Sequence, residues 1–257
     1  IMTSYAVSDT SALLGRSLKH ITRSVDTIVT TAITPIAMML LFVYVFGGAI
    51  KGSTGDENYV NYLLPGILLM AIASGIAYTA LRLFNDMQGG IFERFQSMPI
   101  ARSSVLWAHV LTSMVANAIT VLIIIGVGLI MGFRSSAGPL AWLGVAGILA
   151  LFTLALTWIA VAVGLTAKSV DGATGFSYPL IFLPFISSAF VPTDTMPGPV
   201  RAFAENQPVT SIVNTVSALL AERPVDTGDL VSALAWCTGI LVVAYGGAML
   251  AYRRRIS

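Results

Sequence analysis

Residues Ser135–Ala167 read SSAGPLAWLGVAGILALFTLALTWIAVAVGLTA, without one Asp, Glu, Lys, Arg or His. A helix rises about 1.5 Å per residue, so about 20 apolar residues cross a hydrocarbon layer of about 30 Å. This run is longer than that requirement. It therefore predicts a transmembrane helix.

Five further runs that are poor in ionisable side chains flank the first. They are Thr27–Ile50, Asn58–Leu81, Ser103–Phe133, Gly172–Thr193 and Leu230–Tyr252. Charged residues make up 10% of the 257 residues and hydrophobic residues 56%, whereas soluble domains carry roughly 25% charged residues. The sequence therefore predicts an all-α membrane protein with six transmembrane helices.

The basic residues predict the orientation of these spans. With the N-terminus inside, ten lysines and arginines face the cytoplasm: Arg16, Lys19, Arg23, Arg82, Arg94, Arg102, Lys168, Arg253, Arg254 and Arg255. Four face outside: Lys51, Arg134, Arg201 and Arg223. Because cytoplasmic loops carry the excess of positive charge, both termini are expected in the cytoplasm.

Residues 9–25 precede the first span and separate into two faces on a helical wheel. Leu14, Leu18, Ile21 and Val25 share one face, and Arg16, Lys19 and Arg23 lie opposite. A basic amphipathic helix beside a span is expected to lie flat in the membrane interface. The alternative is a solvated tail, which explains the separation of faces poorly.

A second amphipathic segment, residues 87–99, lies between the second and third spans. Gly89 and Gly90 interrupt the preceding helix, and Pro99 ends the segment. Ile91, Phe92, Phe95 and Met98 share one face, whereas Glu93, Arg94, Gln96 and Ser97 share the other. The apolar face either covers the ends of the membrane helices or fills a groove on a partner protein.

The segment Pro192–Asp229 contains five prolines, too many for one continuous span. A helix is predicted after Pro208, preceded by a shorter helical turn at Val200–Asn206. Such a segment is expected to dip into the outer leaflet as a re-entrant element, packed on protein or lining a cavity. It is either an exit gate or a cap without a gating role.

The sequence contains no set of residues typical of catalysis or of metal binding. His20 lies in the predicted interfacial helix, His109 has no carboxylate at helical spacing on the same face, and Cys237 is the only cysteine. Lys51 precedes Gly52, which is the wrong order for a phosphate-binding loop. The spans also lack the acids that ion-coupled carriers use. A transport pathway here would therefore suit an apolar or amphiphilic cargo, with energy supplied from outside the membrane.

Prolines and glycines indicate where the spans bend or approach closely. Pro35 lies in the first span, and Pro179 and Pro184 lie in the fifth, where each permits a kink. Close helix contacts are expected at Gly126, Gly128, Gly132, Gly144 and Gly147.

Two short motifs and the order of these elements resemble a known family. Residues 93–102 read ERFQSMPIAR, and residues 205–210 read ENQPVT. The first is similar to the Glu-Arg signature of the permease subunits of type-2 ABC exporters, the ABC-2 family. The second is similar to the Asn-x-Pro element of daunorubicin-resistance permeases. The resemblance covers essentially residues 1–257, as a single ABC-2 transmembrane domain in a bacterial cytoplasmic (inner) membrane.

The resemblance implies a division of labour between subunits. Two ABC ATPase subunits would bind ATP and Mg, and this chain would bind neither directly. A second permease chain would complete a homodimer or heterodimer in the lipid membrane, with no nucleic-acid partner. The contacts with the ATPase are expected from Ile91, Phe92, Glu93, Arg94, Phe95, Met98 and Pro99, supported by Arg16, Lys19 and Arg23 of the interfacial helix.

Candidate pathway and gate residues complete the expected site. The pathway candidates are aromatic residues of the first, second and fifth spans: Tyr44, Phe46, Tyr78, Phe176, Tyr178, Phe182 and Phe190. The gate candidates are Asn206 and Pro208. The expected function is export of a drug, antibiotic, lipid or lipid-linked glycan. The alternatives are a non-transporting membrane scaffold and an ATPase-independent carrier or membrane enzyme.

Overall fold

The computed structural model describes residues 25–47, 59–89 and 102–256. All regular elements in these ranges are helical, which confirms the all-α prediction. They are α2 (Val25–Leu40), η1 (Leu41–Phe46), α4 (Tyr59–Gln88), α6 (Arg102–Ile130), α7 (Pro139–Thr166), α8 (Val170–Gly175), α9 (Ser177–Phe182), η2 (Leu183–Ile186), η3 (Thr193–Thr195), α10 (Gly198–Asn206), α11 (Pro208–Leu220) and α12 (Thr227–Ile256).

Four of these helices are long and apolar enough to cross a membrane. They are α4, α6, α7 and α12, at four of the six predicted places. The first and fifth predicted spans correspond to the shorter apolar stretches Thr30–Phe46 and Val170–Ile186. Each has 17 residues, about 25 Å of helix, which is slightly less than a typical hydrocarbon core.

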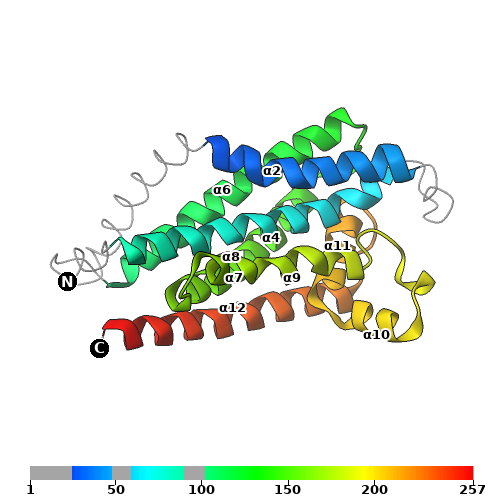
Figure 1. Cartoon of the computed structure of the whole chain (residues 1–257). Coiled ribbons are helices and arrows are strands. Elements are labelled where there is room, and N and C mark those ends of the chain that lie inside the picture. Colours follow the sequence, from blue (N-terminus) through cyan, green and yellow to red (C-terminus); the bar gives the residue numbers. More distant parts are fainter. Residues whose placement is uncertain (1–24, 48–58, 90–101, 257) are drawn as a thin grey trace.

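The helices form a bundle in which the six apolar segments alternate in direction (Figure 1). α12 ends at one end of the bundle, near the last turn of α4, and α10 and α11 lie at the opposite end (Figure 1). These two ends are called the C-terminal end and the α10–α11 end below.

Helix α4 forms the centre of the bundle. It packs against α2, α6, α7, α8, α9 and α11, and 18 of its 30 residues are buried. A helix buried on several faces needs small residues where its neighbours approach closely. A Cβ on Gly66 would lie 2.6 Å from the Cβ of Ala189, and a Cβ on Gly164 of α7 would lie 2.8 Å from the carbonyl oxygen of Ala80.

The glycine contacts differ from those expected from the sequence. A Cβ on Gly126, Gly132 or Gly147 would meet no atom of the described residues within 4 Å. Gly128 and Gly144 do contact side chains of other elements, Leu64 and Leu219. The closest approaches occur instead at Gly66 and Gly164, and at Gly75, which faces Asn117. Glycine spacing along one helix does not reveal these sites, because the neighbouring helix determines which face is crowded.

Gly132 has a different role, which is to end α6. Its φ of +103° is a conformation open to glycine but strained for other residues. The N–H of Phe133 donates to the carbonyl of Gly128 over 2.8 Å, and the N–H of Gly132 donates to the carbonyl of Leu129. These two bonds form a Schellman motif. The uncharged runs predicted to reach Phe133 and begin at Ser135 are therefore separated by a turn.

The two shorter apolar stretches are both irregular. After α2, the chain widens into the π-helix η1. The stretch Val170–Ile186 divides into α8, α9 and the 3-10 helix η2, with Pro179 inside α9 and Pro184 at the start of η2. Proline lacks the N–H that a continuous helix requires. The kinks expected at Pro179 and Pro184 thus coincide with breaks, whereas α2 continues through Pro35.

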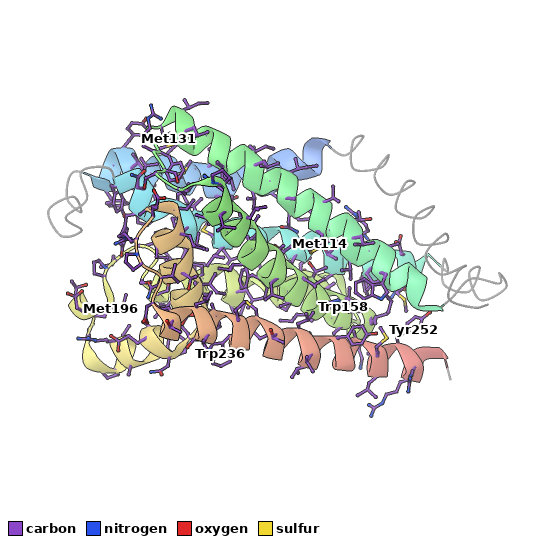
Figure 2. All side chains as sticks on the ribbon, turned by 180° about the vertical axis from the view of Figure 1, so that it is seen from behind. Met114, Met131, Trp158, Met196, Trp236 and Tyr252 are labelled. Atoms are coloured by element: carbon purple, nitrogen blue, oxygen red, sulfur yellow. The ribbon has the colours of Figure 1, made fainter. Side chains whose placement is uncertain are left out.

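A second packing centre lies toward the C-terminal end. Trp158 of α7 is buried, and its ring makes edge-to-face contacts with Trp107 of α6 at 5.2 Å and Tyr245 of α12 at 4.7 Å. Such aromatic pairs stabilise beyond the area that they bury. Trp158 thus ties α7 to both neighbours, and it lies nearer to Tyr252 than to Met131 or Met196 along the bundle (Figure 2).

Candidate functional site

Five phenylalanines from η1, α9, η2 and the residues that follow form one aromatic cluster: Phe42, Phe46, Phe182, Phe185 and Phe190. Phe185 and Phe190 stack with centroids 4.6 Å apart, and Phe42 lies 4.9 Å from Phe190. Phe46 contacts Phe42, and Phe182 contacts Phe185. The first and fifth apolar segments therefore meet through aromatic rings toward the α10–α11 end.

The predicted pathway aromatics divide into exposed and buried groups. Tyr44 is 69% exposed, Tyr178 62% and Phe182 61%, and Phe46 is also exposed. Phe176 is partly buried, and Phe190 is only 2% exposed at the centre of the aromatic cluster. Phe190 therefore packs beneath the exposed aromatic residues and is not itself exposed.

The exposed aromatics belong to a wider apolar surface on α2, η1, α9 and η2, called here the η1–α9 face. Its other large exposed residues are Ile33, Leu40, Leu41, Val45 and Ile186. Exposed apolar residues of this kind contact lipid, a partner chain or an apolar ligand. None of its residues carries a charge.

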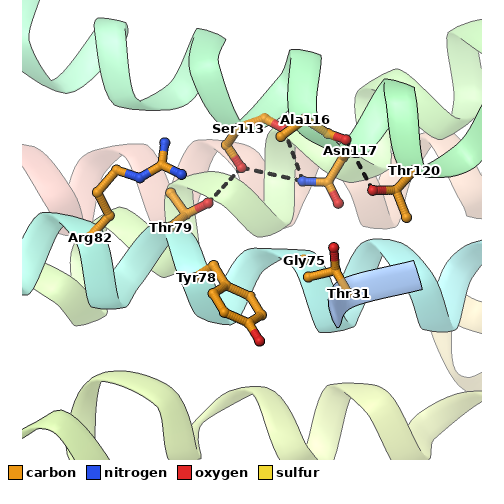
Figure 3. Close-up of a pocket in the computed structure, with 9 residues that line it drawn as sticks. All are labelled: Thr31, Gly75, Tyr78, Thr79, Arg82, Ser113, Ala116, Asn117 and Thr120. Atoms are coloured by element: carbon orange, nitrogen blue, oxygen red, sulfur yellow. Dashed lines mark hydrogen bonds between the residues drawn. The ribbon is translucent and has the colours of Figure 1, made fainter. Parts of the chain in front are cut away.

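A buried polar cluster joins α4, α6 and α7. The hydroxyls of Thr79 and Ser113 lie 2.6 Å apart, and Ser113 is 3.5 Å from the hydroxyl of Thr157. The amide of Asn117 donates to the carbonyl of Ser113 over 3.0 Å (Figure 3). Uncharged polar residues bonded in this way hold membrane helices together.

A cavity of about 30 Å³ adjoins the polar cluster, and the predicted pathway residue Tyr78 lines it together with Thr31, Gly75 and Arg82. The Oδ1 atom of Asn117 is buried and accepts no hydrogen bond from the described residues, and it faces Gly75 (Figure 3). A cavity of this volume with a polar wall has room for a water molecule, which would satisfy the free acceptor.

A histidine–carboxylate contact joins α4 to α6 at the C-terminal end. The Nε2 atom of His109 lies 3.2 Å from Oδ2 of Asp86. With its proton on Nε2, His109 donates a hydrogen bond to this carboxylate in either charge state. Arg82 lies one turn before Asp86 on α4. The sequence analysis found no carboxylate partner for His109, because the partner comes from a different helix.

The junction of α10 and α11 is fixed by Gln207, between the two predicted gate residues. Gln207 is buried, and its amide donates to the carbonyls of Ile186 at 2.6 Å and Leu183 at 3.3 Å. Asn206 is exposed, and its amide donates within α10, to the carbonyl of Ala202. Pro208 begins α11. The residue that connects this junction to η2 is therefore Gln207, which the sequence analysis did not select.

A chain of hydrogen bonds continues this connection at the α10–α11 end. The Tyr62 hydroxyl donates to the Ser188 carbonyl, and the Ser188 hydroxyl donates to Asn214, each over 2.7 Å. The Asn214 amide then donates to Asp229 at the start of α12. These groups border a cavity of about 650 Å³. Three helices, α4, α11 and α12, and the turn after η2 are thus linked around this cavity.

Helix α10 also carries an exposed ion pair. Arg201 Nε donates to Glu205 one turn later over 2.6 Å. This hydrogen bond and the charge of Glu205 raise the pKa of Arg201 above its usual value. The arginine therefore stays charged at every physiological pH, and an exposed pair of this type adds little stability.

Two predicted contact surfaces lie outside the described residues. One is the interfacial helix with Arg16, Lys19 and Arg23. The other is the ATPase-contacting set Ile91, Phe92, Glu93, Arg94, Phe95, Met98 and Pro99. Of the segment 87–99, Met87 and Gln88 are the last residues of α4.

Residues 8–220 match the family model of the ABC-2 type transporter. That match covers most of the chain, which belongs to this family. The protein is therefore a permease subunit of an ABC transporter, a multi-pass membrane protein as the sequence analysis predicted.

Three similar proteins carry drug-resistance names. The daunorubicin resistance ABC transporter permease protein DrrB1 of Streptomyces coeruleorubidus is 29% identical over 97% of this chain and 88% of its own length. The probable doxorubicin resistance ABC transporter permease protein DrrC of Mycobacterium tuberculosis is 26% identical over 96% and 89%. The DrrB protein of the same organism, named for doxorubicin resistance, is 27% identical over 81% and 73%.

Membership in this family implies, in general, an ATPase partner and a dimeric arrangement. The drug-resistance names of the relatives support the expected class of function, a membrane permease of an exporter.

Proposed function

We propose that the chain crosses a bacterial inner membrane six times, as a single transmembrane domain with both termini in the cytoplasm. The alternating direction of the six apolar segments supports this count (Figure 1). The first and fifth segments are short for a full crossing. They would cross where the hydrocarbon layer is thinner, or with less tilt than the long helices. The excess of basic residues in the segments assigned to the cytoplasm supports the orientation.

The cargo that fits this chain is an amphiphilic, drug-like molecule. The observation that carries this proposal is the η1–α9 face, because its exposed aromatics offer stacking area without any charge. Tyr44 and Tyr178 add a hydroxyl for a polar group of the cargo. The names of the relatives, which refer to daunorubicin and doxorubicin, favour a drug over a lipid-linked glycan. A second permease chain would cover the same face and enclose the pathway.

Energy would enter at the C-terminal end through two copies of an ABC ATPase that binds ATP and Mg. The contact residues proposed for the ATPase are those of segment 87–99, supported by the interfacial helix 9–25. The Asp86–His109 pair connects the two helices on either side of segment 87–99, because α4 precedes this segment and α6 follows it. A push on the segment would then move α4, on which the bundle is centred.

The α10–α11 end would form the exit gate in the outer leaflet. Gln207 holds its two helices against η2, and η2 continues the fifth segment. Asn206 and Pro208 flank this contact and would adjust with it. A shift of the fifth segment would therefore move the two helices of the gate directly.

The test is reconstitution of the chain with its ATPase in liposomes, with daunorubicin transport and ATP hydrolysis measured together. Tyr44→Ala and Phe182→Ala are expected to lower drug-stimulated hydrolysis several-fold and leave the thermal unfolding midpoint close to that of the wild type. Phe190→Ala is the matched control, because truncating a buried phenylalanine costs roughly 3–5 kcal/mol of stability. It should lower the unfolding midpoint.

Three results would redirect the proposal. Wild-type transport in both exposed variants would remove the η1–α9 face from the pathway. An ATPase that binds the chain, but whose hydrolysis responds to no drug or lipid, would favour the non-transporting scaffold. Transport without any ATPase would favour the independent carrier.

A further inference from the structure

A groove of about 520 Å³ lies between the C-terminal ends of α7 and α12, away from the η1–α9 face and the gate. We propose that this groove binds one anionic phospholipid, with the phosphate between Lys168 and Arg254 and an acyl chain along Gly247 and Leu250. The site lies apart from the pathway proposed above and does not depend on which cargo is exported.

The charges of the groove favour an anion. Lys168 and Arg254 are both exposed, and the lining contains no carboxylate. An arginine grips phosphate oxygens with two parallel N–H groups, and a lysine adds a point charge. Arg254 takes part in an interaction of its own within the chain. Its guanidinium has five N–H donors, so it can hold a phosphate as well.

The walls of the groove favour a lipid over a soluble phosphate. Leu165, Leu250 and Ala251 supply apolar surface, and a Cβ on Gly247 would meet no described atom within 4 Å. The glycine therefore leaves open a volume that a larger side chain would fill. The Thr166 hydroxyl bonds to the carbonyls of Ala162 and Val163 of its own helix, so this wall adds no competing donor.

The position of the groove agrees with a phospholipid. Lys168 lies two residues beyond the end of α7, and Arg254 lies near the end of α12. Both helices are long enough to cross the membrane, so their ends are expected near the phosphate headgroups. Basic pockets between membrane helices bind anionic headgroups at this depth, and each nearby cation contributes roughly a fivefold gain in affinity.

The experiment compares lipids on the purified full-length chain by native mass spectrometry. Dioleoylphosphatidylglycerol and dioleoylphosphatidylcholine are added at equal concentration, and the ratio of bound adducts is measured. The double variant Lys168→Gln/Arg254→Gln is expected to lose roughly twentyfold of the preference for phosphatidylglycerol. Arg253→Gln is the matched control, because Arg253 is exposed on the same turn of α12 but does not line the groove.

A second pair of variants tests the groove without changing charge. Gly247→Leu fills the groove and is expected to reduce phosphatidylglycerol binding several-fold. Gly246→Leu places the same side chain on the neighbouring residue, outside the lining, and should leave binding unchanged. If the double charge variant fails to fold, this pair decides the question.

Three results would overturn the proposal. One is an unchanged lipid ratio in the folded double variant. Another is an equal loss in the Arg253→Gln or Gly246→Leu control. The third is complete displacement of phosphatidylglycerol by millimolar glycerol 3-phosphate, which would assign the cations to a soluble phosphate.

Discussion

Gly75 of α4 and Asn117 of α6 lie against each other, and their contact leaves no room for a larger side chain at position 75. Asn117 is fixed by its bonds to Ser113. A Cβ on Gly75 would overlap the Oδ1 atom of Asn117 and lie 3.1 Å from its Cγ atom. The asparagine cannot move aside without breaking those bonds.

Gly75→Ala is therefore expected to destabilise the protein by about 1–3 kcal/mol, although alanine is the better helix former. The measurement is thermal unfolding in detergent, followed by tryptophan fluorescence. Gly126→Ala is the control, since that site is open, and it should be neutral or slightly stabilising. Adding Asn117→Ala should recover part of the loss in the Gly75→Ala variant. An additive double mutant would mean that these two residues do not share a contact.

At this scale the sequence predicts the types of residue but not their partners. Tyr78, Tyr44 and Phe182 were selected as pathway candidates by their aromatic character and their place in a span. Phe190 met the same criteria, and only the structure distinguishes it as buried. The partner of His109 was missed because Asp86 is 23 positions earlier in the chain and on another helix.

Among the elements, the α10–α11 hairpin is connected to η2 by one buried side chain. Gln207 supplies the hydrogen bonds that connect it to η2, and its Oε1 atom has no partner among the described residues. Removing the amide would leave the carbonyls of Leu183 and Ile186 without this donor. Unsatisfied buried groups cost about 1–3 kcal/mol each.

Gln207→Leu is accordingly expected to speed amide hydrogen exchange in α10 and the first turn of α11, with a smaller effect on α6. Hydrogen–deuterium exchange followed by mass spectrometry measures this difference directly. Asn206→Ala is the matched control, because Asn206 is exposed and its amide donates within α10. Equal exchange in wild type and Gln207→Leu would show that the hairpin is held elsewhere, for example by Asn214 and Asp229.

The element boundaries show where sequence patterns were sufficient. Five prolines excluded a span over Pro192–Asp229, and two helices do occur there, at Gly198–Asn206 and Pro208–Leu220. The division of Val170–Ile186 into three short helices was harder to predict from the sequence. Hydropathy averages over a window, so it registers an apolar run and not the breaks within it.

For the whole molecule, four of the six proposed crossings, the third to the sixth, can be tested with single cysteines. Cys237 is buried and is the only cysteine, so Cys237→Ala provides a cysteine-free background. Gln88, Arg134, Lys168, Thr195 and Arg253 are exposed and bracket successive apolar segments. Cysteines at Arg134 and Thr195 are expected to react with an impermeant maleimide on intact cells. The other three should react only after permeabilisation.

Each pair of neighbouring sites examines one segment. Labelling of Lys168→Cys and Thr195→Cys from the same side would mean that the short stretch Val170–Ile186 does not cross, which would reduce the count of spans. Complete reversal of all five sites would keep the count and overturn the orientation. The sequence supports the orientation only through the distribution of basic residues, several of which lie outside the described ranges.

The central place of α4 has a consequence for biosynthesis. Of the helices that surround it, only α2 leaves the ribosome earlier, and α6, α7, α8, α9 and α11 all follow. Gly66 packs against Ala189, and Ala80 packs against Gly164. Each of these partners lies more than 80 residues further along the chain. During translation the faces of α4 that pack on α7, α8, α9 and α11 therefore face lipid or the insertion machinery until the second half of the nascent chain encloses them. A ribosome that stalls before residue 164 would release a chain with its future interior still exposed.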